Sequence, residues 1–186
     1  METEKRMELV NAIVDEVRPL LRGSESKKLV DYGSGSGLVS LELTDLVDSI
    51  VLVDSSKQAL QDAEDKISAR GITNCEVLYS DFTEEMPELK ADIVLVSLVL
   101  LHIPDTTLIL QKLFSILPED GQLIIVDFDK NERVNHPKIH SGFSHKELKN
   151  TLSGVGFTSS TCKTFYHGEQ LFANQDASMF IATSRK

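Results

Sequence analysis

The sequence of 186 residues is poor in the features that mark disulfide-stabilised, zinc-binding and membrane proteins. It has no tryptophan and only two cysteines, Cys75 and Cys162, which lie far apart and form no CxxC pair. We therefore expect two free thiols and no metal site. The longest apolar run, over 93–101, is too short to cross a bilayer, which takes about 20 residues, so we expect no membrane insertion.

Basic residues are also scarce, because 19 Lys and Arg face 29 Asp and Glu, for a formal net charge of −10. Nucleic acids and anionic membranes are bound by clustered cations, so we expect neither as a partner. The charge is compatible with a cationic small ligand. The N-terminal residues are charged and unlike a secretory signal, which favours a cytoplasmic protein. The oligomeric state, monomer or homodimer, stays open.

What the sequence does contain is a regular alternation of helical and strand-like segments within the length of one domain. Residues 1–23 are expected to hold an N-terminal helix, closed by Pro19 and Gly23, and residues 24–186 an α/β core. The expected strands are 28–32, 50–53, 76–79, 93–96, 123–128, 158–166 and 178–183. The further expected helices are 38–47, 57–70, 105–117 and 144–153. Because the last two strands lack an intervening helix, we predict a doubly wound, mostly parallel sheet with an antiparallel pair at one edge.

The stretch "VDYGSGSG" places Gly33, Gly35 and Gly37 between a strand and a predicted helix, where glycines let a ligand approach the main chain. The dinucleotide fingerprint G-x-G-x-x-G would need a glycine at Leu38, which argues against a pyrophosphate ligand without excluding it. Asp54 ends the next strand, about twenty residues on, where a carboxylate binds ribose hydroxyls. Its alternative role is to cap the following helix. The pattern predicts an adenosine ligand, either NAD or S-adenosylmethionine.

The stretch from Asp31 to Gly37 resembles the first motif of class I S-adenosylmethionine-dependent methyltransferases, an acidic residue followed by alternating glycines. Further stretches resemble later parts of the family in the same order, namely 52–54, 80–82, "SLVLLHIPD" at 97–105, 117–123 and "HSGFSHKELKNTLSGVGF" at 140–157. The last is similar to the C-terminal unit of the ubiquinone and menaquinone methyltransferases. The resemblance implies a Rossmann-like, seven-stranded sheet in the order 3-2-1-4-5-7-6.

The resemblance also implies a site for S-adenosylmethionine, with S-adenosylhomocysteine as the product. Asp31 would face the methionine ammonium group. The methionine moiety would further contact residues of two loops, namely Gly33, Ser34, Gly35, Gly37, Ser97 and Leu98.

At the other end of the cofactor, the resemblance implies that Asp54 and Ser55 bind the ribose. Asp81 would accept a hydrogen bond from the adenine amine, and Phe82 would contact the adenine face.

Candidates for a general base are His102 and Asp127, with His140 and Asp129 as further possibilities. His102 follows the fourth strand, and a neutral imidazole suits proton acceptance, although it could instead pack on the helix start near Asp105. Asp127 ends the fifth strand, although its carboxylate could instead bind loop amides. Many members of the family position the substrate without a dedicated base.

We therefore expect an S-adenosylmethionine-dependent methyltransferase that acts on a small-molecule acceptor. Two alternatives are a non-catalytic module that binds S-adenosylmethionine or a partner, and an NAD-dependent oxidoreductase. Cover for the site is expected from 1–21, from the 129–142 loop or from 167–177.

Overall fold

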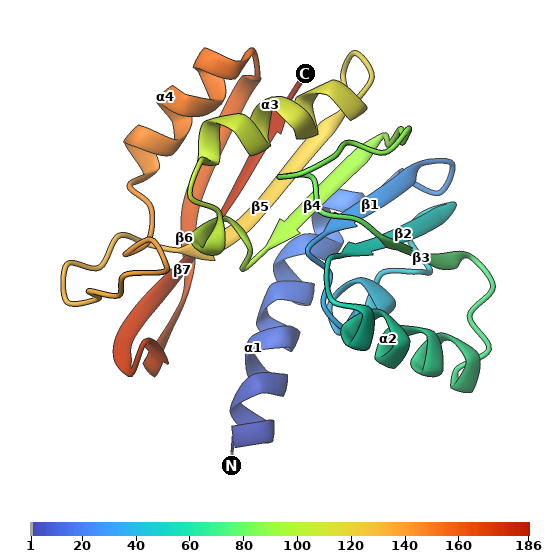
Figure 1. Cartoon of the computed structure of the whole chain (residues 1–186), viewed down its shortest axis with the longest axis horizontal. Coiled ribbons are helices and arrows are strands. Elements are labelled where there is room, and N and C mark those ends of the chain that lie inside the picture. The colour runs from blue at the N-terminus through green and yellow to red at the C-terminus, as the bar shows by residue number, and fades with distance from the viewer. Residues whose placement is uncertain (1) are drawn as a thin grey trace.

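The computed structural model describes residues 2–186, in which helices cover both faces of one central sheet (Figure 1). Met1, the first residue of the predicted N-terminal segment, lies outside the described residues. The strands are β1 (Lys28–Tyr32), β2 (Ser49–Asp54), β3 (Cys75–Tyr79), β4 (Ile93–Ser97), β5 (Gln122–Phe128), β6 (Thr158–Phe172) and β7 (Gln175–Arg185). The helices are α1 (Glu2–Val17), α2 (Lys57–Ala69), α3 (Thr106–Ile116) and α4 (His145–Val155), with short 3-10 helices η1 (Arg18–Leu21), η2 (Ser40–Glu42) and η3 (Leu100–His102).

The seven strands run in the order β3-β2-β1-β4-β5-β7-β6, which confirms the predicted topology. The first five strands are parallel, and β7 pairs antiparallel with both β5 and β6. A hydrophobic core lies on each face of the sheet. Neighbouring residues of one strand belong to different cores, since Leu29 packs on the side of α1 and α2 and Val30 on the side of α3 and α4. Strand β5 is buried at every position because both of its faces are covered.

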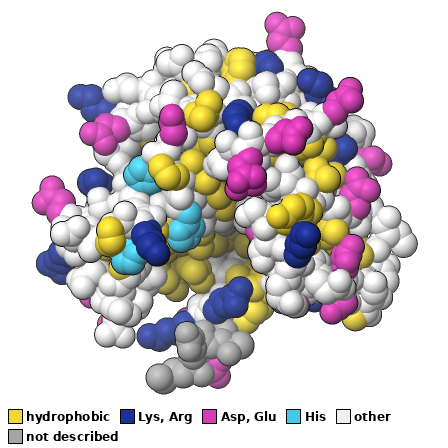
Figure 2. Space-filling model, in the orientation of Figure 1, with side chains coloured by type: hydrophobic (Ala, Val, Ile, Leu, Met, Phe, Trp, Pro, Cys, Tyr) yellow, Lys and Arg dark blue, Asp and Glu magenta, His cyan; other side chains and the backbone are white. Residues whose placement is uncertain are grey.

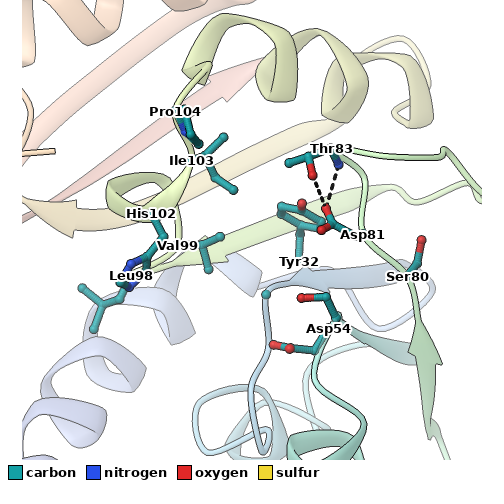
Figure 3. A pocket seen from close by; sticks show the side chains of 12 residues that line it. Tyr32, Asp54, Ser80, Asp81, Thr83, Leu98, Val99, His102, Ile103 and Pro104 are labelled. Atoms are coloured by element: carbon teal, nitrogen blue, oxygen red, sulfur yellow. Dashed lines mark hydrogen bonds between the residues drawn. The ribbon is translucent and has the colours of Figure 1, made fainter. Parts of the chain in front are cut away.

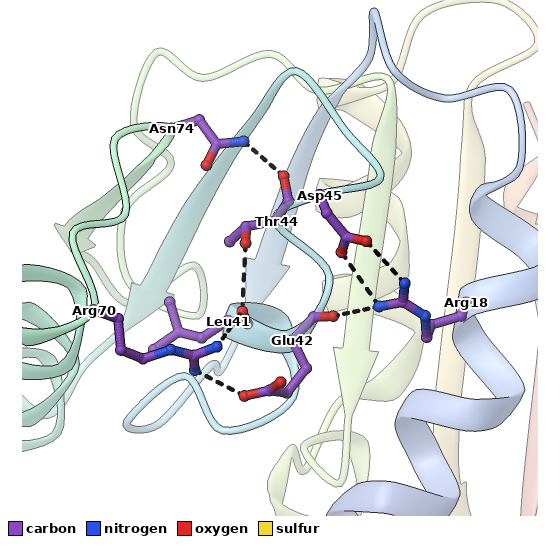
Figure 4. A network of polar contacts seen from close by, with 7 residues as sticks. All are labelled: Arg18, Leu41, Glu42, Thr44, Asp45, Arg70 and Asn74. Carbon is purple, nitrogen blue, oxygen red and sulfur yellow. Dashed lines mark hydrogen bonds and ion pairs between the residues drawn. The ribbon is translucent and has the colours of Figure 1, made fainter.

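The predicted α-helix over 38–47 is wrong, because the segment holds only the three-residue η2. Its carbonyl groups bind side chains that lie far away in the sequence (Figure 4). Arg18 Nη1 donates to the Glu42 carbonyl at 2.7 Å. Asn74 Nδ2 donates to the Thr44 carbonyl at 2.8 Å. These tertiary bonds satisfy carbonyl groups that an α-helix would have used within its own backbone.

The last two strands are longer than predicted, and they meet in a two-residue turn rather than a loop. Ala173 and Asn174 form this turn with positive φ values of 49° and 59°, as tight hairpin turns require. The predicted covering loop over 167–177 is therefore a hairpin, whose tip projects at the lower left in Figure 1. None of the helices in residues 2–186 combines the length and hydrophobicity that a membrane span requires.

The 129–142 loop is irregular, as predicted, but hydrogen bonds fix it at both ends. The Asn131 side chain donates to the Asp176 carbonyl at 3.0 Å, and the His140 amide donates to the Leu101 carbonyl at 2.8 Å. Gly142 has a φ of 88°, and a Cβ added there would lie 2.2 Å from the carbonyl oxygen of Asp129. A side chain at this position would displace the loop.

We expect Gly142→Ala to lower the free energy of unfolding by about 2–4 kcal/mol, since it combines an unfavourable φ with a backbone clash. Urea denaturation measures the change. Gly154→Ala is the matched control, because a Cβ at Gly154, in the last turn of α4, meets no atom within 4 Å. The control should be neutral or stabilising by up to about 1 kcal/mol, and equal losses in the two variants would contradict the role of Gly142.

Candidate functional site

The glycine loop folds back over the end of β2. The amides of Gly33 and Ser34 both donate to the Val53 carbonyl, at 2.8 and 3.0 Å. A Cβ added at Gly33 would lie 2.3 Å from a methyl group of Val99, so only glycine allows this close approach. A Cβ added at Gly35 would meet no atom within 4 Å, which leaves the main chain open to a ligand.

Two cavities meet at this loop. The first has a volume of about 410 Å³ and lies beside the carboxyl ends of β1, β2, β3 and β4 (Figure 3). The second, of about 180 Å³, lies between the loop and α1. Gly33 and Leu98 line both cavities, so the two are adjacent. Small-molecule sites commonly enclose about 300–1,000 Å³, a range that the first cavity alone reaches.

Asp54 and Ser55 line the first cavity. The two carboxylate oxygens of Asp54 accept hydrogen bonds from the amides of Gly35 and Ser56, both at 2.8 Å. Ser56, rather than Asp54, caps α2, since its hydroxyl accepts from the Ala59 amide. Asp54 is therefore a link between the glycine loop and the start of α2, and its side chain borders the cavity.

Asp81 also lines the first cavity, whereas the ring of Phe82 does not. One Asp81 oxygen accepts from the amide and the hydroxyl of Thr83, at 2.8 and 2.6 Å (Figure 3). The Phe82 side chain is fully buried and stacks on Tyr32, with ring centroids 4.6 Å apart. Phe82 thus supports Tyr32, whose ring forms part of the cavity wall.

Asp31, on β1, borders the second cavity together with Ser97 and Leu98. Only 3% of its surface is exposed, and the Ser40 hydroxyl donates to its carboxylate at 2.6 Å. Burial raises the pKa of Asp31 to about 7, and the nearby negative charge of Asp54 acts in the same direction, while the Ser40 bond opposes them. A cationic group in the second cavity would favour the ionised carboxylate.

The two predicted catalytic residues lie in different surroundings. His102 lines the first cavity, and burial lowers the pKa of its imidazole, which favours the neutral form. Asp127 is fully buried and lines neither cavity. Its oxygens accept from the amides of Leu101, at 3.2 Å, and Phe128, at 2.8 Å, and burial raises its pKa to about 7. These bonds match its alternative role, in which it holds the segment after β4.

Sequence reasoning missed several wall residues, namely Tyr32, Ser80, Thr83, Val99, Ile103 and Pro104 of the first cavity and Arg6, Leu9, Val10 and Ile13 of the second. Tyr32 and Ser80 stand at strand ends, which is a signal that could have found them. The segment 1–21 was expected to help cover the site, and Arg6, Leu9, Val10 and Ile13 do border the second cavity, but which of its residues would do so depends on how α1 docks. Within residues 2–186, no group of three or more His, Cys, Asp or Glu side chains could hold a metal ion.

Comparison with known proteins identifies the family. A family model described as a methyltransferase domain matches residues 24–174. The tRNA 5-carboxymethoxyuridine methyltransferase of Escherichia coli (strain K12) is 24% identical over 140 residues, which cover 70% of this chain and 54% of the relative. The chain thus spans about half the length of the curated relatives it matches. The resemblance to quinone-biosynthesis methyltransferases stays an expectation.

Solved structures share the fold. A SAM-dependent methyltransferase from Aquifex aeolicus superposes with a TM-score of 0.70 at 19% identity, covering 92% of this chain and 88% of the other. The phosphoethanolamine N-methyltransferase 2 of Haemonchus contortus, in complex with S-adenosyl-L-methionine, gives 0.72 at 12% identity, covering 88% and 49%. With the family model covering most of its length, this chain belongs to the methyltransferase domain family and has the fold of the class I S-adenosylmethionine-dependent methyltransferases.

Proposed function

We propose that the chain transfers the methyl group of S-adenosylmethionine to a small-molecule acceptor. The observation that carries this proposal is the adjacent pair of cavities, which has acidic side chains at or just after three strand ends. Asp31, Asp54 and Asp81 each offer a carboxylate, one for the methionine ammonium, one for the ribose hydroxyls and one for the adenine amine. When bound, S-adenosylmethionine supplies a methyl group on a sulfonium, and the C–S electron pair stays on sulfur as the acceptor bonds to the methyl carbon.

The residues present fit this cofactor. The open main chain at Gly35 gives the methionine moiety a surface without side chains. The other proposed contacts of that moiety are Gly33, Ser34, Gly37, Ser97 and Leu98. Ser55 lies beside Asp54 on the ribose side of the first cavity. We assign to Phe82 the support of Tyr32 in place of direct contact with the adenine ring.

The charge of the chain supports a small acceptor. The net charge of −10 opposes binding of a polyanion such as the tRNA on which the Escherichia coli relative acts. His102, neutral at the cavity wall, is the proposed proton acceptor where the acceptor atom carries a proton, and Asp127 positions the segment that bears it.

We expect S-adenosylmethionine and S-adenosylhomocysteine, but not NAD, to stabilise the protein in a thermal-shift measurement. At 100 times its dissociation constant a ligand adds about 2.7 kcal/mol, which for a domain of this size raises Tm by roughly 5–10 °C. A shift with NAD alone would favour the oxidoreductase. Cofactor binding with no methyl transfer across a metabolite panel would favour the non-catalytic module.

Asp54→Ala should weaken S-adenosylmethionine binding by about tenfold or more, since a hydrogen bond to a charged group contributes about 1.5–3 kcal/mol. Isothermal titration calorimetry measures the affinity. Asp62→Ala on the exposed side of α2 removes the same charge at a distance from both cavities and should leave the affinity unchanged. Equal affinities for the two variants would remove Asp54 from the site.

Cofactor affinity should rise with pH through the titration of Asp31. With a pKa of about 7, Asp31 in the free protein is roughly one-tenth ionised at pH 6 and nine-tenths at pH 8, so affinity should increase by about ninefold over that range. Asp31→Asn should flatten this dependence. Asp127 has a similar pKa but lies outside the cavities, so a slope that persists in Asp31→Asn would contradict the assignment.

A further inference from the structure

The charges of the chain are unevenly distributed. Residues 129–149 hold five Lys and Arg and three Asp and Glu, for a formal charge of +2, together with three of the five histidines. The rest of the chain holds 14 Lys and Arg against 26 Asp and Glu, for a formal charge of −12. The chain as a whole is strongly acidic, but the segment made of the 129–142 loop and the start of α4 has a positive formal charge.

This segment lies beside the hollow that Figure 2 shows in the middle of the presented face. The floor of the hollow is hydrophobic. Histidine, lysine and arginine side chains gather on its left and lower sides, where Figure 1 places the yellow-orange 129–142 loop and α1. Most acidic side chains on this face lie over its upper and right-hand parts. Arg6, from α1, borders the second cavity and adds positive charge on the side of the cofactor.

The cations of the loop are available to a ligand. Lys130, Arg133 and Lys138 are exposed, and none of the side chains described in residues 4–186 forms an ion pair with them. Lys130 Nζ donates to the Ser141 hydroxyl at 2.7 Å, which holds one ammonium group near the end of the loop. Of the two acidic side chains of the loop, Asp129 already accepts from His145 and Thr164, at 2.6 and 2.7 Å, and Glu132 is exposed between Lys130 and Arg133.

The loop is also tied to the cofactor side of the site. The imidazole Nε2 of His140 lies 2.6 Å from the carbonyl oxygen of Ile103, and Ile103 lines the first cavity. The His140 amide bonds to Leu101, in η3, next to His102. These bonds of His140 therefore attach the 129–142 loop, which carries the cations, to the side of the cavity in which the cofactor is proposed to lie.

From this arrangement we infer that the methyl acceptor is a small amphipathic anion. Its apolar body would lie on the hydrophobic floor of the hollow, and a single carboxylate, phosphate or sulfonate-like group would face the cations of the 129–142 loop. The inference rests on the proposed function and deepens it, because it names the chemical class of the acceptor.

The distance over which charges interact in salt solution favours a small acceptor. At physiological ionic strength, charges interact over about 8 Å, so a single anionic group at the loop is attracted by the local cations and largely screened from distant acids. A polyanion such as RNA extends well beyond this distance and would meet the −12 of the remaining chain. The charge pattern therefore favours a small anion over a nucleic acid.

Two fluorescent probes test the inference directly. 1-Anilinonaphthalene-8-sulfonate has an aromatic body and one anionic group, and N-phenyl-1-naphthylamine has the same body without the charge. On protein saturated with S-adenosylhomocysteine we expect the sulfonate to bind at one site and more tightly than the neutral probe. The variant K130Q/R133Q/K138Q should weaken the sulfonate by about tenfold and leave the neutral probe unchanged.

The matched control is R22Q/K27Q/K90Q, which makes the same change in net charge with exposed residues outside the loop and outside both cavities. Equal affinities for the two probes, or equal losses in the two variants, would overturn the inference. Binding of a mixed tRNA preparation that depends on the three loop cations would also overturn it, in favour of a nucleic-acid acceptor. Loss of S-adenosylhomocysteine binding itself would instead count against the proposed function, so the two failures are distinguishable.

Discussion

The site depends on the hydrogen bonds that hold the glycine loop against the end of β2. The carbonyl group of Val53 accepts hydrogen bonds from two loop amides, and the carboxylate of Asp54 accepts one from a third. The loop can pack this tightly because Gly33 has no side chain to collide with Val99, from the segment after β4. As a result, the first and second cavities meet at Gly33. The residue proposed to bind the ribose is therefore also one that shapes the surface for the methionine moiety.

Much of the fold follows from local sequence patterns. Continuous apolar runs predict strands buried on both faces, and helices between consecutive strands, such as α2 between β2 and β3 and α3 between β4 and β5, favour the parallel pairing that β1 to β5 show. The helix caps at Asp105 and Ser144 were also predictable, because a side chain that accepts from an amide three residues later is a local interaction. The segment 38–47 shows the limit. Its pattern of leucines favours a helix, but Arg18, Arg70 and Asn74 bind its carbonyl groups from positions 24 to 30 residues away.

The candidate site likewise contains residues whose place the sequence predicted and residues whose surroundings it did not. Asp54 was predictable because strand ends of a parallel sheet meet at one edge, the family resemblance added Asp31 and Asp81, and all three border a cavity. For Phe82 the contact with a ligand stays a prediction, while the structure shows its ring fully buried and stacked on Tyr32. Asp127 has the position of a site residue, but its carboxylate turns toward the amides of Phe128, in the same strand, and Leu101, in η3. Position along a strand is thus a better guide to location than to the direction of a side chain.

This division explains why the fold identifies the methyl donor more readily than the acceptor. The donor side consists of strand ends and tight glycine turns, whose geometry the sheet imposes. The proposed acceptor side lies by the 129–142 loop and α1, outside the sheet, and the loop is held by bonds such as the one between the His140 imidazole and the Ile103 carbonyl. Such a loop can change its charge without disrupting the sheet, so its composition is where we infer the chemistry of the proposed acceptor from. In a chain of net charge −10, the basic side chains of this loop are the observation on which that inference rests.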